Sequence, residues 1–368
     1  MSTQSKSDQG AQFKSQQIKW DGTPPLDFRY EVLQQPPLEM WEAMMKVTPG
    51  MANAGQDRYV NELEALAADL TGKEAALFLP TTTNCTALTH MNRDLRGKQV
   101  ILESRCHIFW VEGLHISAMS SAAPRILRGD KFGAMDLDEM EGIFKETAYG
   151  YRIPVGMVCL ENTHNVCGGT VLTPQYTAKV ADLAHRYGAE LFLDGARVVN
   201  AAVAQDVPIK ALTGPADHVV ISLNKGLGAP MGAVLCSSAE FLQGVRLLAK
   251  RTGMLAVHKA GLFAAAGIIA LTKMVEGLAD DHSRARRLAG ALAEMKGLYV
   301  DMETVQTNLF RVNTEPSGLT AYQLAERVAA HGLGIHILEP YAFKMSLSYG
   351  INDTKVDQAI AVFKQVLA

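Results

Sequence analysis

The 368-residue sequence has no long hydrophobic run, no paired cysteine motif and no excess of charge of either sign. Its longest apolar run, 260–271, includes glycines and falls short of the roughly 20 residues that a membrane-spanning helix needs, so we expect a buried helix there. The five cysteines lack C-x-x-C spacing, and their odd number disfavours a disulfide framework and favours reduced thiols in the cytoplasm. A formal net charge of −3 without a long basic run excludes the usual electrostatic footprint of nucleic-acid or membrane binding. We therefore expect a small-molecule partner.

The apolar residues that are present form short runs that alternate with amphipathic segments. The runs at 75–79, 155–160 and 219–223 have the length and composition of strands buried on both faces. Helical periodicity appears between such runs, as at 136–146 and 173–188. Strand, helix and strand in succession predict an α/β fold with a mainly parallel sheet and flanking helices.

The length of the chain allows one large domain and a smaller one. Residues 1–20 are rich in Ser, Gln and Lys and are predicted to form a mobile arm. We expect 21–50 to pack on the small domain, 51–255 to form the large ligand-binding domain, and 256–368 to form linker helices and a small α+β C-terminal domain.

Three polar residues lie where two predicted strands end. The strand at 191–193 is followed by D-G-A-R, which contains Asp194 and Arg197, and the strand at 219–223 by N-K-G-L-G-A-P-M-G, which contains Lys225. Ligands bind at the carboxyl ends of the strands in open α/β sheets, so these side chains are expected to converge. Desolvation between an apolar strand and glycines would lower the pKa of the Lys225 amine and favour its nucleophilic form. This chemistry indicates a Schiff base with pyridoxal phosphate, whose pyridinium nitrogen Asp194 would keep protonated.

Plainer interpretations of these residues also exist. A single Lys after a strand is usually a solvated charge, and Asp-Gly is usually a turn. A single His after a strand is more often structural than catalytic. The hydroxyl-rich run at 81–86, which follows a strand, is compatible with a helix cap as well as with a phosphate site at a helix N-terminus. A dinucleotide site is disfavoured, because the glycine spacing is G-x-G-x-x-x-G and a strand follows.

Two further stretches extend the pattern, G-K-E-A-A-L-F-L-P at 72–80 and E-N-T-H-N at 161–165. Together with L-D-G-A-R and N-K-G-L-G-A-P-M-G, they resemble the threonine aldolase branch of the β-eliminating lyase family, which are fold type I pyridoxal-phosphate enzymes. The resemblance implies a fold type I transferase-like fold and a homodimer or homotetramer. Segments 51–58 and 253–259 are the candidates to complete a neighbouring subunit's site. No metal is expected.

The resemblance also implies roles for residues at matching positions. His107 would stack on the cofactor ring, and we nominate His164 as general base because the pKa of an imidazole lies near neutral pH. The other implied cofactor contacts are Thr82, Thr83, Asn84, Asn224 and His258. Arg197 would bind the cofactor's phenolic oxygen or the substrate carboxylate, and the other implied carboxylate ligands are Arg29 and Lys344.

The sequence departs from the family pattern mainly where the substrate would lie. Tyr30 stands in place of a serine, 53–55 in place of V-Y-G, and Lys344 in place of an arginine. Lysine offers a point charge rather than the planar fork of a guanidinium. Thr82 also replaces a glycine, and His258 falls in the segment that usually carries a phosphate-binding arginine. We expect the family's cofactor chemistry on a different, bulkier or more polar, amino acid.

The leading functional hypothesis is retro-aldol cleavage of an L-β-hydroxy-α-amino acid, such as threonine, allo-threonine or a phenylserine-like compound, to glycine and an aldehyde. An alternative is another pyridoxal-phosphate reaction, namely β-elimination, racemisation or decarboxylation. A third possibility is a binding or regulatory protein on a decayed enzyme scaffold. Retention of Asp194, Lys225, His107 and His164 together disfavours it.

Overall fold

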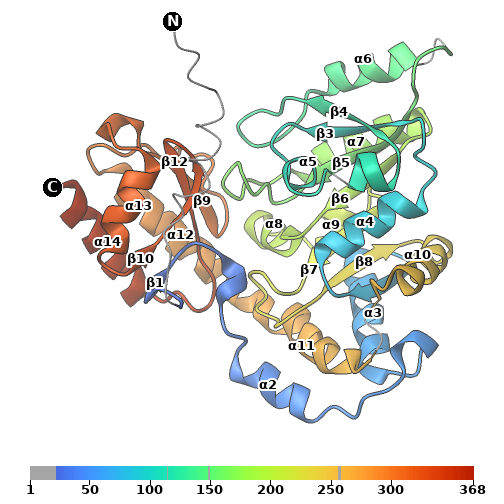
Figure 1. The fold of residues 1–368 in the computed structure, drawn as a ribbon, viewed down its shortest axis with the longest axis horizontal. Helices are drawn as coiled ribbons and strands as arrows, with labels where there is room; N and C mark the ends of the chain where they lie inside the picture. Colours follow the sequence, from blue (N-terminus) through green and yellow to red (C-terminus); the bar gives the residue numbers. More distant parts are fainter. Residues whose placement is uncertain (1–21, 114, 148–149, 256–257) are drawn as a thin grey trace, which may run out of the picture.

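The computed structural model describes residues 22–113, 115–147, 150–255 and 258–368. They form a large α/β unit and a smaller α+β unit that lie side by side (Figure 1). The predicted arm at 1–20 and two residues of the segment 253–259 lie outside the described ranges.

The large unit is built on a seven-stranded sheet with the order β2-β8-β7-β6-β5-β3-β4. Every neighbouring pair from β7 to β4 is parallel, whereas β8 is antiparallel to both β2 and β7. The predicted α/β class with a mainly parallel sheet is therefore confirmed. The strands are β2 (Ala75–Leu79), β3 (Gln99–Glu103), β4 (Ala123–Leu127), β5 (Val155–Glu161), β6 (Glu190–Asp194), β7 (His218–Ser222) and β8 (Ala233–Ser237).

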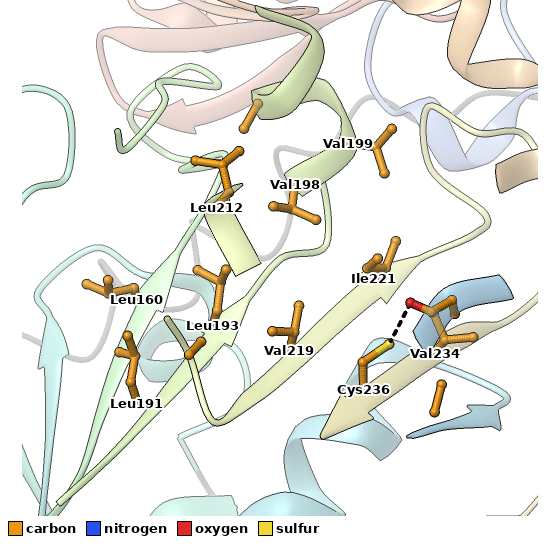
Figure 2. Close-up of a cluster of buried hydrophobic side chains, with 14 of the residues drawn as sticks. Leu160, Leu191, Leu193, Val198, Val199, Leu212, Val219, Ile221, Val234 and Cys236 are labelled. Atoms are coloured by element: carbon orange, nitrogen blue, oxygen red, sulfur yellow. Dashed lines mark hydrogen bonds between the residues drawn. The ribbon is translucent and has the colours of Figure 1, made fainter. Parts of the chain in front are cut away.

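Helices cover both faces of this sheet because each strand presents apolar side chains on both sides. Figure 2 shows Leu160, Leu193 and Val219 of the sheet beneath side chains of two helical segments. The helices on that face include α3 (Arg58–Thr71), α7 (Pro174–Arg186), α8 (Val198–Gln205), α9 (Ile209–Thr213) and α11 (Ala260–Thr272). The other face is covered mainly by α4 (Thr82–Asn92) and α10 (Ala239–Thr252).

Capping residues determine where the helices next to the strand ends begin. The carboxylate of Asp57 accepts hydrogen bonds from the backbone N–H groups of Tyr59 and Val60, which starts α3. The hydroxyl of Thr81 accepts from the N–H of Asn84 at 3.0 Å, which starts α4 directly after β2. The N-terminus of α4 is thereby held at the carboxyl edge of the sheet.

The small unit contains an antiparallel sheet with the order β11-β12-β9 and a two-stranded parallel pair formed by β1 and β10. The N-terminal strand β1 lies among the C-terminal elements (Figure 1), so the two ends of the described chain share one core. The elements are β1 (Leu26–Asp27), β9 (Leu309–Asn313), β10 (Leu333–Gly334), β11 (His336–Glu339), β12 (Ala342–Ser346), α12 (Leu278–Ala293), α13 (Ala321–Ala329) and α14 (Asp353–Leu367).

The segment 21–50 contacts both units. Its strand β1 pairs with β10 of the small unit, whereas α2 (Leu38–Met45) packs against α11 of the large unit. The proposed domain boundaries stay a prediction. Among the described residues no single helix is long and apolar enough to cross a membrane, although α11 and 274–293 meet the length criterion as a pair bent by 47°.

Some short elements have no periodic pattern in the sequence that would predict them. The edge strand β4 has one buried residue, Leu127, and contains Pro124, which an edge strand tolerates because it lacks a partner on one side. A π-helix at His115–Met119 likewise follows no simple period.

Candidate active site

A cavity of about 260 Å³ lies where the carboxyl edge of the large sheet faces the small sheet. One wall comes from the ends of β5 and β6, from α5 (His107–Trp110) and from the loop after β7. The opposite wall comes from β11, β12 and the turn η1 (Glu31–Leu33). The predicted site residues that line the cavity are His107, Asp194, Arg197, Lys225 and Lys344.

A larger open hollow of about 730 Å³ lies elsewhere and is lined by residues that include His282 and Arg286 of α12. It contains none of the predicted site residues. The smaller cavity is therefore the candidate active site.

Asp194 and Lys225 share the large-unit wall. Asp194 is the last residue of β6 and is buried. This burial and the nearby Glu161 carboxylate raise the pKa of Asp194, whereas the Lys225 amine acts to lower it. Burial and the Arg197 guanidinium lower the pKa of the Lys225 amine. An amine with a lowered pKa is more often in its nucleophilic form, as expected from its position after an apolar strand.

His107 stands beside this pair at the start of α5. Its backbone N–H donates to the carboxylate of Glu161 at 2.7 Å, and its Nε2 lies 3.6 Å from Oε1 of Glu112. Burial lowers the pKa of the imidazole, but the carboxylates of Glu112, Asp194 and Glu161 outweigh that effect and raise it. Contacts with two carboxylates, those of Glu161 and Glu112, therefore hold the His107 imidazole at the cavity wall.

Arg197 is held by a residue that the sequence patterns do not reveal. Its Nε donates to Oε2 of Glu31 at 2.7 Å, and its Nη2 lies 2.6 Å from the same oxygen. The other Glu31 oxygen accepts from the side chain of Asn308. Burial would raise the pKa of the Glu31 carboxyl, but Arg197, Asn308 and Lys225 reverse this and lower it. A buried ion pair therefore joins the N-terminal segment to the large unit at the base of the cavity.

Lys344 reaches the cavity from β12 and is only 4% exposed. Its Nζ donates to the side-chain oxygen of Asn165, which belongs to the E-N-T-H-N stretch. Burial and the neighbouring Arg197 and Lys225 lower the pKa of Lys344 to about 7, against the pull of Glu31 and Glu161. Its charge is therefore adjustable near neutral pH.

The residues predicted for the cofactor phosphate occupy the first turn of α4 but do not line this cavity. Asn84 is part of the Thr81 cap, and the Thr83 hydroxyl donates to Glu112 at 2.6 Å. Glu112 links this helix end to His107, because the same oxygen faces both side chains. The phosphate role of Thr82, Thr83 and Asn84 stays a prediction, supported by a helix N-terminus at the edge of the sheet.

His164 does not line the cavity, contrary to the role proposed for it from the sequence. Its side chain is 1% exposed, its Nε2 lies 3.0 Å from the Glu103 carboxylate, and its Nδ1 accepts from the backbone N–H of Cys167. Both ring nitrogens are used in internal contacts. This geometry gives His164 a structural part, so its role as general base stays a prediction, and the cavity lining offers other candidates.

Three other nominated residues also lie off the cavity lining. Arg29 makes a two-point ion pair with Asp27 at 2.9 Å for each contact. His258 is exposed and forms an isolated backbone bridge with Met51. The side-chain oxygen of Asn224 accepts from Ser222. The ligand contacts proposed for these three side chains stay predictions.

Tyr30, which the sequence places where the substrate would lie, lines the cavity, and among the lining residues that were not nominated from the sequence are Glu31, Glu161, Asn165 and His336. Glu161 and Asn165 belong to E-N-T-H-N, and their position at the end of β5 and shortly after it is a usable signal. Glu31 and His336 carry no local signal. They reach the cavity only through the packing of the small unit.

The side chains on the cavity wall fit pyridoxal phosphate. An amine with a lowered pKa can bond covalently to the cofactor aldehyde, and a buried carboxylate can stabilise a protonated ring nitrogen. His107 supplies an imidazole at the same wall, and the N-terminus of α4 begins where β2 ends. The fold and this set of groups define a fold type I pyridoxal-phosphate enzyme.

Comparison with known proteins defines the family within that class. A family model described as beta-eliminating lyase matches residues 27–315. Low-specificity L-threonine aldolase 1 of Arabidopsis thaliana is 33% identical over 345 residues, which cover 93% of this chain and 96% of that protein. Low specificity L-threonine aldolase of Escherichia coli K12 is 33% identical over 269 residues, which cover 73% and 79% of the two chains. The chain therefore belongs to the β-eliminating lyase family, in its threonine aldolase branch.

A solved structure of threonine aldolase from Leishmania major has the same fold, with a TM-score of 0.78, 19% identity and coverage of 94% of this chain and 100% of that chain. The protein is a pyridoxal-phosphate-dependent lyase.

Proposed function

We propose that the protein cleaves an L-β-hydroxy-α-amino acid to glycine and an aldehyde. The observation that carries this proposal is the meeting of Lys225, Asp194 and His107 on one wall of a cavity whose opposite wall presents Lys344. Membership of the threonine aldolase branch supports the same reaction. When bound, pyridoxal phosphate supplies an electron sink for the pair released at the α-carbon.

The large-unit wall holds the cofactor. The Lys225 amine would anchor it, because that amine has a lowered pKa and lies in the loop after β7. Asp194 would hold a proton at the ring nitrogen, and His107 would supply its imidazole to the ring face. The burial of Asp194 excludes water from this contact and so strengthens it.

The cations of the cavity bind the substrate carboxylate. Lys344 is tethered to Asn165, and Arg197 is fixed by Glu31, so both charges have defined positions. A lysine gives one point contact where an arginine gives a fork. The second contact to the carboxylate is assigned to Arg197.

The proton of the β-hydroxyl has to pass to a group inside the cavity, which His164 does not line. His107 is the proposed acceptor. Its imidazole lines the cavity, and the Glu112 carboxylate at 3.6 Å stabilises the imidazolium formed by proton uptake. Because carboxylates raise the pKa of His107, the acidic limb of the rate profile is expected above pH ~6.5, the ordinary value for histidine.

Product analysis tests the proposed reaction. The cofactor-loaded protein is incubated with L-threonine, L-allo-threonine and L-threo-phenylserine, while glycine, aldehyde, 2-oxo acid with ammonia, and carbon dioxide are measured in parallel. Glycine and aldehyde in equal amounts support aldol cleavage. A 2-oxo acid (2-oxobutyrate from threonine or allo-threonine, phenylpyruvate from phenylserine), carbon dioxide or a racemised amino acid without aldehyde contradicts it and identifies β-elimination, decarboxylation or racemisation instead.

We further propose that the protein is a homodimer or homotetramer. Large apolar side chains are exposed on α2 and α5, among them Leu38 and Trp110 at 70% each. The segments at 51–58 and 253–259 adjoin through the backbone bridge between Met51 and His258. Sedimentation velocity tests this proposal, and a fully active monomer would contradict it.

A further inference from the structure

The small-unit wall of the cavity carries an aromatic pair that neither the family pattern nor the proposed chemistry explains. The rings of Tyr30 and His336 meet edge to face, with centroids 4.6 Å apart and an interplanar angle of 66°. Both residues line the cavity that contains Lys225. Such pairs form a rigid surface with a preference for other aromatic or apolar groups.

The position of this pair is fixed by the elements that carry it. His336 of β11 lies directly opposite Lys344 of β12 in the antiparallel register, so the two side chains occupy the same face of the small sheet. Tyr30 immediately precedes Glu31, whose carboxylate is bound to Arg197. The exposed fraction of the residue is 4% for Lys344, intermediate for His336 and 38% for Tyr30. The wall therefore runs from the interior of the cavity to its mouth.

The chemistry of the mouth is apolar and uncharged. Val32 and Val111 also line the cavity and are 47% and 69% exposed. Burial and the cations Lys344 and Arg29 lower the pKa of His336 to about 4, so its imidazole is neutral at physiological pH. Arg29, which also acts on the His336 pKa, does not line the cavity and forms an ion pair with Asp27. A second acidic group on the substrate has no suitable partner at this mouth.

We propose that Tyr30 and His336 form the subsite for the β-substituent of the substrate and select an aromatic or bulky apolar substituent over the methyl group of threonine. This inference rests on the proposed function, since it places the substrate carboxylate at Lys344 and its amine at Lys225. The β-substituent then extends along the remaining direction, toward the mouth.

Kinetics with two substrates test the subsite. Wild-type protein is expected to show a higher kcat/KM for L-threo-phenylserine than for L-threonine. The Tyr30→Ala variant should lose about fivefold to tenfold with phenylserine, the range that one aromatic contact supplies, and change less than twofold with threonine. Tyr30→Phe should retain the preference, because the ring and not the hydroxyl makes the contact. An equal loss with both substrates, or a wild-type preference for threonine, overturns the proposal.

Binding measurements separate the subsite from the reaction. L-phenylalanine and L-2-aminobutyrate have no β-hydroxyl and so cannot undergo aldol cleavage, and their dissociation constants are measured by calorimetry on the cofactor-loaded protein. Tyr341→Ala is the matched control, because Tyr341 is 43% exposed on the same unit and does not line the cavity. Circular dichroism confirms that each variant is folded.

Each combination of results has one meaning. The subsite is supported if L-phenylalanine binds more tightly than L-2-aminobutyrate, and if Tyr30→Ala and His336→Ala weaken its binding whereas Tyr341→Ala does not. This holds even if no amino acid is cleaved, and in that case only the proposed reaction fails. Cleavage of both substrates with no effect of Tyr30 or His336 on either readout overturns the subsite and leaves the reaction standing. Tighter binding of L-glutamate than of L-phenylalanine also overturns it, since the mouth would then recognise an acid.

Discussion

The two walls of the cavity differ in how they are built and in how closely they follow the family. The large-unit wall places Asp194 and Lys225 at the ends of neighbouring strands, so a local strand-end pattern defines it. The small-unit wall combines Tyr30 and Glu31 from the start of the chain with His336 and Lys344 from its end. The proposed function thus assigns cofactor chemistry and substrate recognition to separate structural units. One can change while the other is kept.

The largest expected effect comes from removing the amine of the large-unit wall. Lys225→Ala should abolish turnover and the borohydride-reducible bond between protein and cofactor together, because no other described lysine lines the cavity except Lys344 on the opposite wall. Mass spectrometry after borohydride treatment measures the bond. Lys296→Ala, at an exposed site, is the control. A reducible bond that survives at full level in Lys225→Ala would assign the anchor to another residue.

Asp194→Asn should leave the cofactor bound but lower kcat by about 10²-fold to 10³-fold, the typical cost of losing one electrostatic contact in a buried site. The amide cannot stabilise a protonated ring nitrogen. Cofactor absorbance and steady-state rates report binding and turnover separately. Unchanged kcat would mean that another group protonates the ring nitrogen and that Asp194 on the large-unit wall does not stabilise its protonated form.

The connection between the two walls can be broken at Glu31. Glu31→Gln leaves the Arg197 guanidinium buried without its anionic partner and should lower the free energy of unfolding by about 3–5 kcal/mol. Because the pKa of Glu31 is lowered in the folded protein, its stabilisation is complete above its unfolded pKa of ~4.3 and is lost as pH falls through the lower folded pKa. Thermal unfolding of both proteins at a series of pH values from 7 downward through that window tests this. A difference that widens with acidification would contradict the assignment.

The smallest effect concerns the charge of the small-unit wall. Because the pKa of Lys344 is about 7, the cation that holds the carboxylate is lost as pH rises. The KM of the wild type should therefore increase by about tenfold per pH unit once the pH is above that pKa. Lys344→Arg should remove this increase, since a guanidinium stays charged. KM profiles from pH 6 to 9 measure it, and a Lys344→Met variant with unaltered KM would show that Lys344 is not a carboxylate ligand.

The sequence predicts the large-unit wall well because its signals are local. One apolar run leads directly into Asp194, and the next leads into Asn224 and Lys225. Both runs are therefore expected to end at the same edge of the sheet, and in the structure Asp194 and Lys225 line the same cavity. The small-unit wall is different. Glu31 and Arg197 are 166 residues apart, and no local pattern indicates that the pairing of β1 with β10 brings the N-terminal segment to the cavity.

His164 stays off the cavity lining for a related reason. E-N-T-H-N correctly marks a strand end, but which of its side chains enters the cavity depends on a partner 61 residues away, Glu103. Asn165 and Glu161 line the cavity instead. The sequence does offer a local partner for Arg29, because Asp27 lies two residues before it and binds its side chain in the structure.

The shared core of the two chain ends also orders the events of folding. The seven-stranded sheet uses residues 75–237, whereas the wall that faces it needs β1 and β12, which lie at opposite ends of the chain. Contacts of such long sequence separation form late, because the loop between them costs entropy before any contact is made. During synthesis the large-unit wall is therefore expected to form before the small-unit wall, which is completed only after β12 has been made.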